Sequence, residues 1–214
     1  MKIEINKDLY ETEKELSAVN RQTFADFKLP VVNLIGSPGC GKTTLLEATL
    51  AFMRGQGKRI GIIEGDVQTS IDSDRLAGFG MPVSLVNTNG GCHLSSEDIR
   101  RAAHTLPLDT LDLLIIENVG NLVCPAAFDL GESMKIAVLS APEGEEKPLK
   151  YPALFANAGC AIITKIEIAQ ICRFDLDKAM ENIRSVNPDV KIIPLSVFEG
   201  TNMDEYFSFM LGIV

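Results

Sequence analysis

Short apolar runs alternate with amphipathic stretches along most of this 214-residue chain. Runs rich in Val, Ile and Leu predict strands at 31–35, 60–63, 83–86, 111–116, 136–139, 161–163 and 191–195. Several lack polar alternation, which is typical of parallel strands that are covered on both faces. Helical patterns lie between them at 43–54, 72–80, 95–105, 148–157, 176–186 and 202–211. The pattern therefore predicts an α/β fold with a mostly parallel sheet of about seven strands, helices on both faces and right-handed crossovers.

The start of the chain follows a different pattern. Apolar positions such as Leu9, Leu16, Val19 and Phe24 are scattered among Glu and Lys, which predicts a mildly amphipathic helix over 4–26. Pro30 marks a boundary just before the first predicted strand. We therefore expect an N-terminal helical extension over 1–30 and one nucleotide-binding domain over 31–214.

A phosphate-binding motif follows the first predicted strand directly. Residues 36–44 match G-x-x-x-x-G-K-[ST] and lie between an apolar strand and a helix, as this motif requires. Lys42 is expected to contact the β- and γ-phosphates, while the Thr43 hydroxyl binds Mg²⁺ and backbone N–H groups surround the phosphates. The sequence therefore predicts a P-loop NTPase. Its phosphate-binding residues are Gly36, Ser37, Pro38, Gly39, Cys40, Gly41, Lys42, Thr43 and Thr44.

Acidic residues at the ends of nearby predicted strands are candidates for organising Mg²⁺ or the attacking water. Asp66 follows the second strand and is expected to bind Mg²⁺ together with Thr43. Glu117 and Gly120 form an acid-x-x-Gly pattern whose glycine N–H can sense a γ-phosphate. Asp72 lies beyond a Thr/Ser-rich turn and is a candidate for positioning water. The alternative for these acids is that they only cap helices or face solvent.

A late segment has the form of a guanine-reading loop. Thr164, Lys165 and Glu167 occupy the places that Asn, Lys and Asp take in the Asn-Lys-x-Asp pattern. The lysine stem can stack on a base and the carboxylate can accept from two N–H groups, but both outer positions depart from the pattern. Ser196 and Val197 follow the last predicted strand, where a Ser-Ala-type loop contacts the guanine oxygen. Guanine is therefore favoured, and an unrelated turn is the alternative.

Two further segments carry candidate metal ligands. Cys92 and His93 follow the third predicted strand, and Cys124 follows the fourth, so both segments are expected at the carboxyl edge of the sheet. Two thiolates and an imidazole suit Zn²⁺ or Ni²⁺, although buried and unreactive cysteines are equally common. Cys160 and Cys172 are expected to be ordinary core or surface thiols.

Composition narrows the classes of function. The 20 Lys and Arg against 29 Asp and Glu give a formal net charge of −9 and a pI of about 4.8, which argues against nucleic-acid binding. No segment approaches about 18 apolar residues, so membrane insertion is not expected, and the charged start lacks the apolar core of a secretory signal. Five cysteines without a secreted framework indicate a reducing cytoplasm.

Together these motifs resemble the hydrogenase nickel-incorporation GTPases (HypB-type), metallochaperones of the signal-recognition-particle/MinD-like class of P-loop GTPases. The matching segments cover nearly everything after residue 30, and they include G-S-P-G-C-G-K-T-T-L-L-E, I-E-G-D-V-Q-T-S-I-D-S-D-R, N-G-G-C-H-L and I-E-N-V-G-N-L-V-C-P-A. The resemblance implies that Cys92, His93 and Cys124 bind Ni²⁺ or Zn²⁺ near the interface of a GTP-dependent homodimer. It also implies hydrogenase large subunits and other nickel-delivery proteins as partners.

Two departures from that family stand out. The lead of 30 residues contains neither the Cys-x-x-Cys motif nor the His-rich tract of some relatives. Thr164 and Glu167 replace the usual Asn and Asp of the base-reading loop.

We therefore expect slow GTP hydrolysis coupled to nickel release for an apo-hydrogenase. The alternatives are a nucleotide-binding metal carrier or scaffold with little turnover, a urease-type accessory GTPase, whose Cys-Pro-His motif differs from Cys124-Pro125-Ala126, and a small-molecule kinase.

Overall fold

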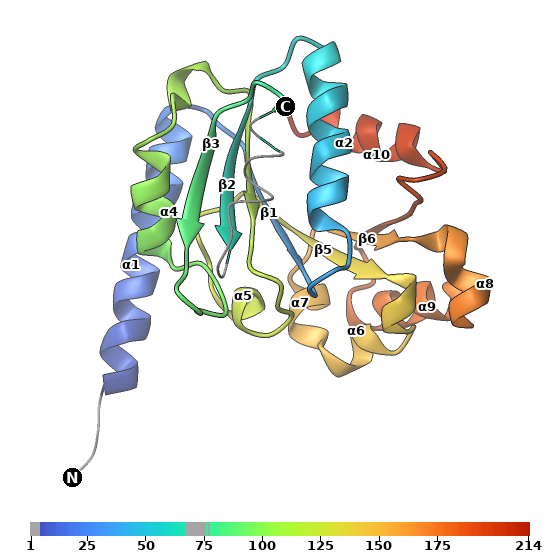
Figure 1. The fold of residues 1–214 in the computed structure, drawn as a ribbon. Helices are drawn as coiled ribbons and strands as arrows, with labels where there is room; N and C mark the ends of the chain where they lie inside the picture. Colours follow the sequence, from blue (N-terminus) through green and yellow to red (C-terminus); the bar gives the residue numbers. More distant parts are fainter. Residues whose placement is uncertain (1–4, 67–75, 77) are drawn as a thin grey trace.

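The architecture is a parallel sheet with helices on both faces, as the sequence predicts. The computed structural model describes residues 5–66, 76 and 78–214 (Figure 1). Its seven-stranded sheet has the order β3-β2-β4-β1-β5-β6-β7, and every neighbouring pair is parallel. The strands are β1 (Val31–Gly36), β2 (Ile60–Asp66), β3 (Val83–Asn87), β4 (Leu113–Glu117), β5 (Met134–Ser140), β6 (Cys160–Thr164) and β7 (Lys191–Pro194).

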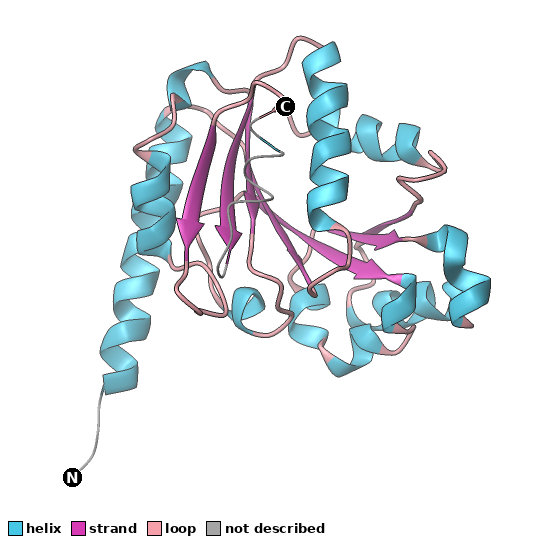
Figure 2. Cartoon of the chain, viewed as in Figure 1, coloured by secondary structure: helices cyan, strands magenta, loops and turns pink. Residues whose placement is uncertain are grey.

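The helices divide the core into three apolar clusters. On one face of the sheet, α2 and α10 pack over side chains from six strands, β1, β2 and β4–β7. On the other face, α7 and α9 cover β5 and β6, while α1 and α4 cover β2 and β4 (Figure 2). The helices are α1 (Ile5–Asp26), α2 (Lys42–Gly55), α4 (Ser96–Ala103), α5 (Cys124–Ala127), α6 (Lys147–Lys150), α7 (Pro152–Ala156), α8 (Ala169–Cys172), α9 (Leu176–Val186) and α10 (Met203–Leu211).

The N-terminal helix α1 is anchored to the rest of the chain by buried contacts. Phe24 is only 3 % exposed and belongs to the cluster beneath α4. The Asn20 side-chain amide donates to the carbonyl oxygens of Ser96, at 2.8 Å, and Leu130, at 3.1 Å. Arg21 pairs with Asp129 at 2.6 Å. These contacts hold α1 against α4 and against the segment that precedes β5.

Two predicted elements differ from the structure. The strand expected at 111–116 begins at Leu113, because Asp112 turns its carboxylate back to the Arg59 N–H and to Lys58. The helix expected at 148–157 is two short helices, α6 and α7, that break at Tyr151. Pro152 follows, and a proline disfavours the helical conformation of the residue before it. The helix expected at 72–80 lies largely outside the described residues.

We predict that Phe24→Ala lowers the free energy of unfolding by about 3–5 kcal/mol, because it removes a buried ring from the α1–α4 cluster. The matched control is Phe27→Ala, whose ring is 46 % exposed and whose loss should cost less than about 1 kcal/mol. Urea unfolding followed by circular dichroism measures both. Equal losses would contradict the packing of α1 described above.

Candidate functional site

The phosphate loop connects β1 to α2 at the carboxyl edge of the sheet, near the foot of α2 in Figure 1. Gly39 and Gly41 adopt left-handed backbone conformations, with φ of 72° and 97°, which glycine reaches without steric cost. The Lys42 side chain is only 7 % exposed, and its ammonium group donates to the carbonyl oxygens of Gly36, at 3.2 Å, and Ser37, at 3.3 Å. A cation and the start of a helix therefore lie together, as a phosphate site requires.

Oxygen ligands lie beside this loop. The Thr43 hydroxyl donates to Glu117 Oε1 at 2.7 Å, which joins the first turn of α2 to the end of β4. Glu64 lies next to Glu117 in the β2–β4 register, and both side chains are buried. Hydroxyl and carboxylate oxygens are the ligands that Mg²⁺ prefers, so the residues present fit that ion. Sequence reasoning missed Glu64, although it too closes an apolar strand.

Two of the predicted acids, Asp66 and Asp72, lie at or beyond the limit of the described residues. Asp66 is the last residue of β2, and its backbone is in register with Asn87 of β3. The structure describes the backbone of Asp66 but not its side chain. Asp72 lies outside the described residues altogether. Their roles toward Mg²⁺ and water stay predictions.

Gly120 lies against the phosphate loop. A Cβ atom at this position would come within 2.8 Å of Pro38 Cγ and 2.9 Å of the Pro38 backbone. No side chain fits there without displacing one of the two segments. The acid-x-x-Gly segment therefore runs in direct contact with the phosphate loop, and the sensing of a γ-phosphate by the Gly120 N–H stays a prediction.

The candidate base-reading segment also touches the phosphate loop. The Thr164 hydroxyl donates to the Cys40 carbonyl at 2.6 Å, and the Lys165 ammonium donates to the Gly39 carbonyl at 2.7 Å. Glu167 has one buried carboxylate oxygen that lacks a hydrogen-bond partner within the described part of the chain. Buried acceptors of this kind are normally paired, so the position suits a ligand that supplies N–H donors.

The second base-reading loop lies next to the first. The Ile166 N–H donates to the Leu195 carbonyl at 3.5 Å, which brings Glu167 close to the segment that holds Ser196 and Val197. Ser196 is buried, and its hydroxyl accepts from the Glu199 N–H at 3.0 Å, which shapes the turn. The two predicted base-contacting loops are therefore neighbours.

The metal candidates come together across the same edge. Ligand atoms of Cys92, His93 and Cys124 all lie within 4.8 Å of one another. Cys92 and His93 belong to the turn between β3 and α4, and Cys124 begins α5. Their strands, β3 and β4, are not neighbours, because β2 lies between them. The ring of Phe128 stacks on His93 with 4.2 Å between centroids and orients the imidazole.

The surroundings of Cys92 and His93 change the pKa of both side chains. A hydrogen bond with Cys124, and secondarily burial, raises the pKa of Cys92. The thiolate is the form that binds a metal, so an ion bound here would displace the proton of the Cys92 thiol. Burial lowers the pKa of His93, so its imidazole is neutral at neutral pH and able to donate a lone pair.

The remaining cysteines behave as expected. All five are free thiols. Burial raises the pKa of Cys40 to about 11 and that of Cys160 to about 12, so neither is a thiolate at neutral pH. Cys172 is exposed. Cys40 thus contributes its backbone, through the carbonyl that Thr164 contacts, and not its sulfur.

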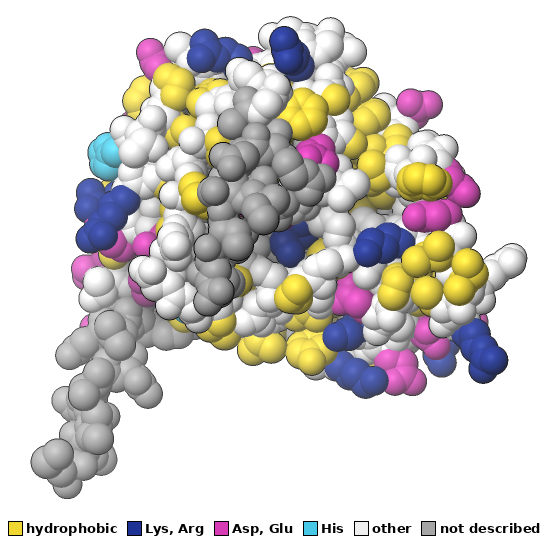
Figure 3. Space-filling model, in the orientation of Figure 1, with side chains coloured by type: hydrophobic (Ala, Val, Ile, Leu, Met, Phe, Trp, Pro, Cys, Tyr) yellow, Lys and Arg dark blue, Asp and Glu magenta, His cyan; other side chains and the backbone are white. Residues whose placement is uncertain are grey.

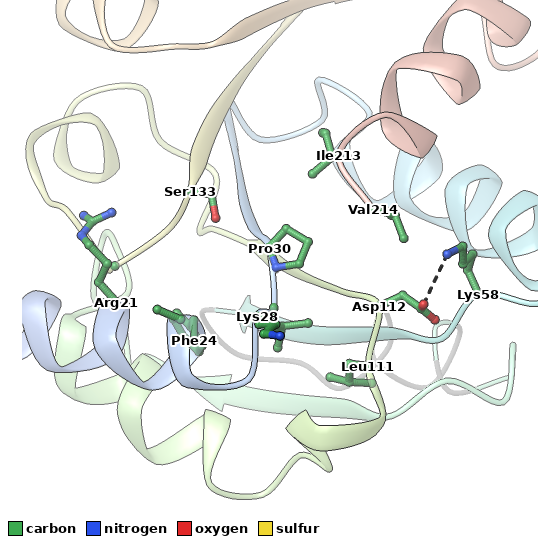
Figure 4. A pocket seen from close by; sticks show the side chains of 13 residues that line it. Arg21, Phe24, Lys28, Pro30, Lys58, Leu111, Asp112, Ser133, Ile213 and Val214 are labelled. Carbon is green, nitrogen blue, oxygen red and sulfur yellow. Dashed lines mark hydrogen bonds and ion pairs between the residues drawn. The ribbon is translucent and has the colours of Figure 1, made fainter.

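A cavity of about 580 Å³ lies at the opposite edge of the sheet, where β1, β2, β4 and β5 begin (Figure 4). The Lys58 ammonium pairs with Asp112 at 3.4 Å in its wall, and Ile213 and Val214 line another side. It is remote from the phosphate loop and is no part of the candidate site. Basic and acidic side chains are interspersed on the face shown in Figure 3, in keeping with a protein that binds its anion locally.

The fold and the loop geometry define a P-loop nucleotide-binding protein. A family model described as "CobW/HypB/UreG, nucleotide-binding domain" matches residues 30–194. The chain belongs to this family.

Curated relatives and solved structures agree with that assignment. "Hydrogenase maturation factor HypB" of Escherichia coli (strain K12) is 45 % identical over 208 residues, which are 97 % of this chain and 71 % of the relative. "Hydrogenase/urease maturation factor HypB" of Helicobacter pylori (strain ATCC 700392 / 26695) is 36 % identical over 96 % of this chain and 88 % of that protein. The crystal structure of HypB from Helicobacter pylori in complex with nickel aligns with a TM-score of 0.89 at 35 % identity and covers 94 % of both chains.

Among the described residues, helices long and apolar enough to traverse a lipid bilayer are absent.

We predict that iodoacetamide at about pH 8 modifies Cys172 first, because this thiol is exposed and reaction requires an accessible thiolate. Cys92 is also exposed, but its raised pKa should slow its reaction. Cys40 and Cys160 should react only after denaturation. Peptide mass spectrometry of native and urea-treated samples measures each site. Rapid modification of Cys40 in the native protein would show that the phosphate loop is more open than described.

Proposed function

We propose that this chain is a GTP-dependent nickel metallochaperone for [NiFe]-hydrogenase maturation. The observation that carries the proposal is the meeting of Cys92, His93 and Cys124 at the same sheet edge as the phosphate loop. The names of the relatives, hydrogenase maturation factors and a nickel-bound HypB, support it. The cycle couples binding and slow hydrolysis of GTP to holding and releasing the metal.

The phosphate loop and its neighbours carry the nucleotide chemistry. Lys42 and the loop amides bind the β- and γ-phosphates and stabilise charge that develops during hydrolysis. Thr43 and Asp66 hold Mg²⁺, which neutralises phosphate charge when bound. Glu117 positions the Thr43 hydroxyl, a role supported by their 2.7 Å hydrogen bond. Gly120 senses the γ-phosphate through its N–H, and Asp72 is the candidate for positioning the attacking water.

Guanine is the base that best suits the two predicted base-reading loops, the one over 164–167 and the one that holds Ser196 and Val197. The free buried oxygen of Glu167 accepts one of the two N–H groups on the Watson–Crick edge of guanine, and its second oxygen accepts the other. The Lys165 stem lies along the base, while Ser196 and Val197 face the guanine oxygen. Thr164 braces the phosphate loop through Cys40.

Nickel is cargo at the Cys/His site. Soft thiolates and a neutral imidazole favour Ni²⁺ or Zn²⁺ over hard ions such as Mg²⁺. One chain supplies three ligands and leaves a coordination position open for a second copy or an acceptor protein. We infer a homodimer that forms around GTP and places the metal near its interface. Val123, 58 % exposed beside Cys124, supplies apolar surface for that contact.

The partners follow from this role. The hydrogenase large subunit receives the metal, and other hydrogenase-maturation and nickel-delivery proteins exchange it. We place the cycle in the cytoplasm, where five free thiols remain reduced.

A nucleotide-binding metal carrier with little turnover is the second candidate. The departures at Thr164 and Glu167 favour it, because a changed base-reading loop alters how the nucleotide is held. It differs from the main proposal only in whether phosphate is released.

We predict that Lys42→Ala lowers phosphate release from GTP by about 10²- to 10³-fold, because it removes a cation from the transferring phosphoryl group. The control is Lys58→Ala, which removes a lysine at the opposite edge of the sheet and should leave the rate unchanged. A phosphate-release assay on the purified protein measures both. A wild-type rate no higher than that of Lys42→Ala would favour the carrier.

We predict that Cys92→Ser and Cys124→Ser each weaken Ni²⁺ binding at least tenfold, measured by competition with a chromogenic chelator. Cys172→Ser, which removes an exposed thiol outside the cluster, should not. Affinity should fall as the pH is lowered from about 8 to about 6, because protons compete for the thiolates and the imidazole. Binding that is independent of pH, or insensitive to both substitutions, would place the nickel elsewhere.

A further inference from the structure

The segment over 118–123 connects the two candidate sites. It starts beside Glu117, whose carboxylate contacts Thr43, passes Pro38 at Gly120, and ends at Cys124. Cys92 and His93 come from a different part of the chain, on the far side of β2. Within the part of the chain that the structure describes, a connection between 118–123 and the 92–94 segment would let the nucleotide influence all three metal ligands.

Asn118 makes the first of these connections. Its side chain is almost fully buried, and its Oδ1 atom accepts from the Leu94 N–H at 3.2 Å and from the Val119 N–H at 3.0 Å. Leu94 directly follows His93, so one amide oxygen joins the backbone of the metal segment to the backbone that follows Glu117.

The orientation of the Asn118 amide is dictated by a buried chain of partners. Glu132, whose carboxylate only accepts, lies 3.3 Å from Asn33 Nδ2, so Asn33 must direct its NH₂ group there. Asn33 Oδ1 then faces Asn118, which must donate its own NH₂ group at 3.3 Å. The Asn118 oxygen is then free to accept from the Leu94 N–H. Each hydrogen bond in this network therefore has one defined donor and one defined acceptor.

Asn121 makes the second connection. Its Nδ2 atom donates to the Cys92 carbonyl at 3.2 Å, and its Oδ1 atom accepts from the Val123 N–H at 2.9 Å, one residue before Cys124. The Asn121 side chain thereby connects the backbone of Cys92 to the backbone just before Cys124. Unlike Asn118, it is partly exposed, so it can be changed with little cost to the core.

We propose that Asn118 and Asn121 are positioning residues that transmit a displacement of the nucleotide-sensing segment to the Cys92–His93 segment. The inference rests on the proposed function. A shift at Gly120 moves 118–123, and the two amides pull the backbone of 92–94 with it. The geometry of the thiolates and imidazole around a metal ion changes accordingly, which gives the nucleotide a differential effect on metal affinity.

The test compares nickel affinity in the presence of GDP and of a non-hydrolysable GTP analogue. The ratio of the two dissociation constants measures coupling, and allosteric ratios commonly lie between about 5 and 150. Asn121→Asp keeps the acceptor for Val123 but replaces the donor to Cys92 with a carboxylate. Asn157→Asp is the matched control, because Asn157 Nδ2 makes the same kind of bond, to the Ala153 carbonyl at 2.8 Å, on an exposed helix end.

We expect the ratio in Asn121→Asp to fall to within about twofold of one, while Asn157→Asp keeps the wild-type ratio. The affinity of both variants for the GTP analogue, measured without metal, should equal that of the wild type. This control matters because a general destabilisation of the protein would change that affinity. Asn118→Asp should also lose coupling, because its second oxygen meets Asn33 Oδ1.

If the wild-type protein shows coupling and Asn121→Asp keeps the same ratio of nickel dissociation constants, this inference is overturned and the proposed function remains intact. A wild-type ratio of one overturns both.

Discussion

The contact of Gly120 with Pro38 constrains everything else at the carboxyl edge of the sheet. Because no side chain fits between them, a displacement of the phosphate loop toward Gly120 would push the segment after β4 as well. The hydrogen bond from Thr43 to Glu117 joins the same two segments a second time. The segment ends at Cys124, so a mechanical route from phosphate to thiolate exists within a few residues. The proposed coupling of GTP to metal depends on this contact.

The buried amides extend that constraint across the sheet. Asn33, Asn118 and Glu132 lie in an apolar interior where an unpaired polar group is costly, yet each finds a partner. Such a chain of hydrogen bonds has one satisfied arrangement, so it holds the segments that it joins in a defined relation. Replacing Asn118 by an apolar residue would remove the hydrogen bond that holds the Leu94 N–H and would leave Asn121 as the remaining connection to this segment.

The parts of the site that sequence reasoning recovered are those whose signals are local. The motif over 36–44 predicts a loop between a strand and a helix, and the structure has this loop, with positive φ at Gly39 and Gly41 and with Lys42 buried against the Gly36 carbonyl. The convergence of Cys92, His93 and Cys124 also matches the expectation that strand ends share one edge. Glu64 escaped notice, because only the pairing of β2 with β4 brings it beside Glu117. The break at Tyr151 was missed although Pro152 signals it.

The sequence by itself determined the fold class and the phosphate loop, because apolar periodicity and glycine spacing act over a few residues and need no distant partner. It also determined which side chains are available for metal binding. Only the tertiary structure decided that β2 separates β3 from β4 and that the metal ligands meet nonetheless. It alone paired Asn118 with Leu94 and Asn121 with Cys92. Hydrogen bonds between residues more than twenty positions apart depend on strand order and packing, and no spacing along the chain encodes them.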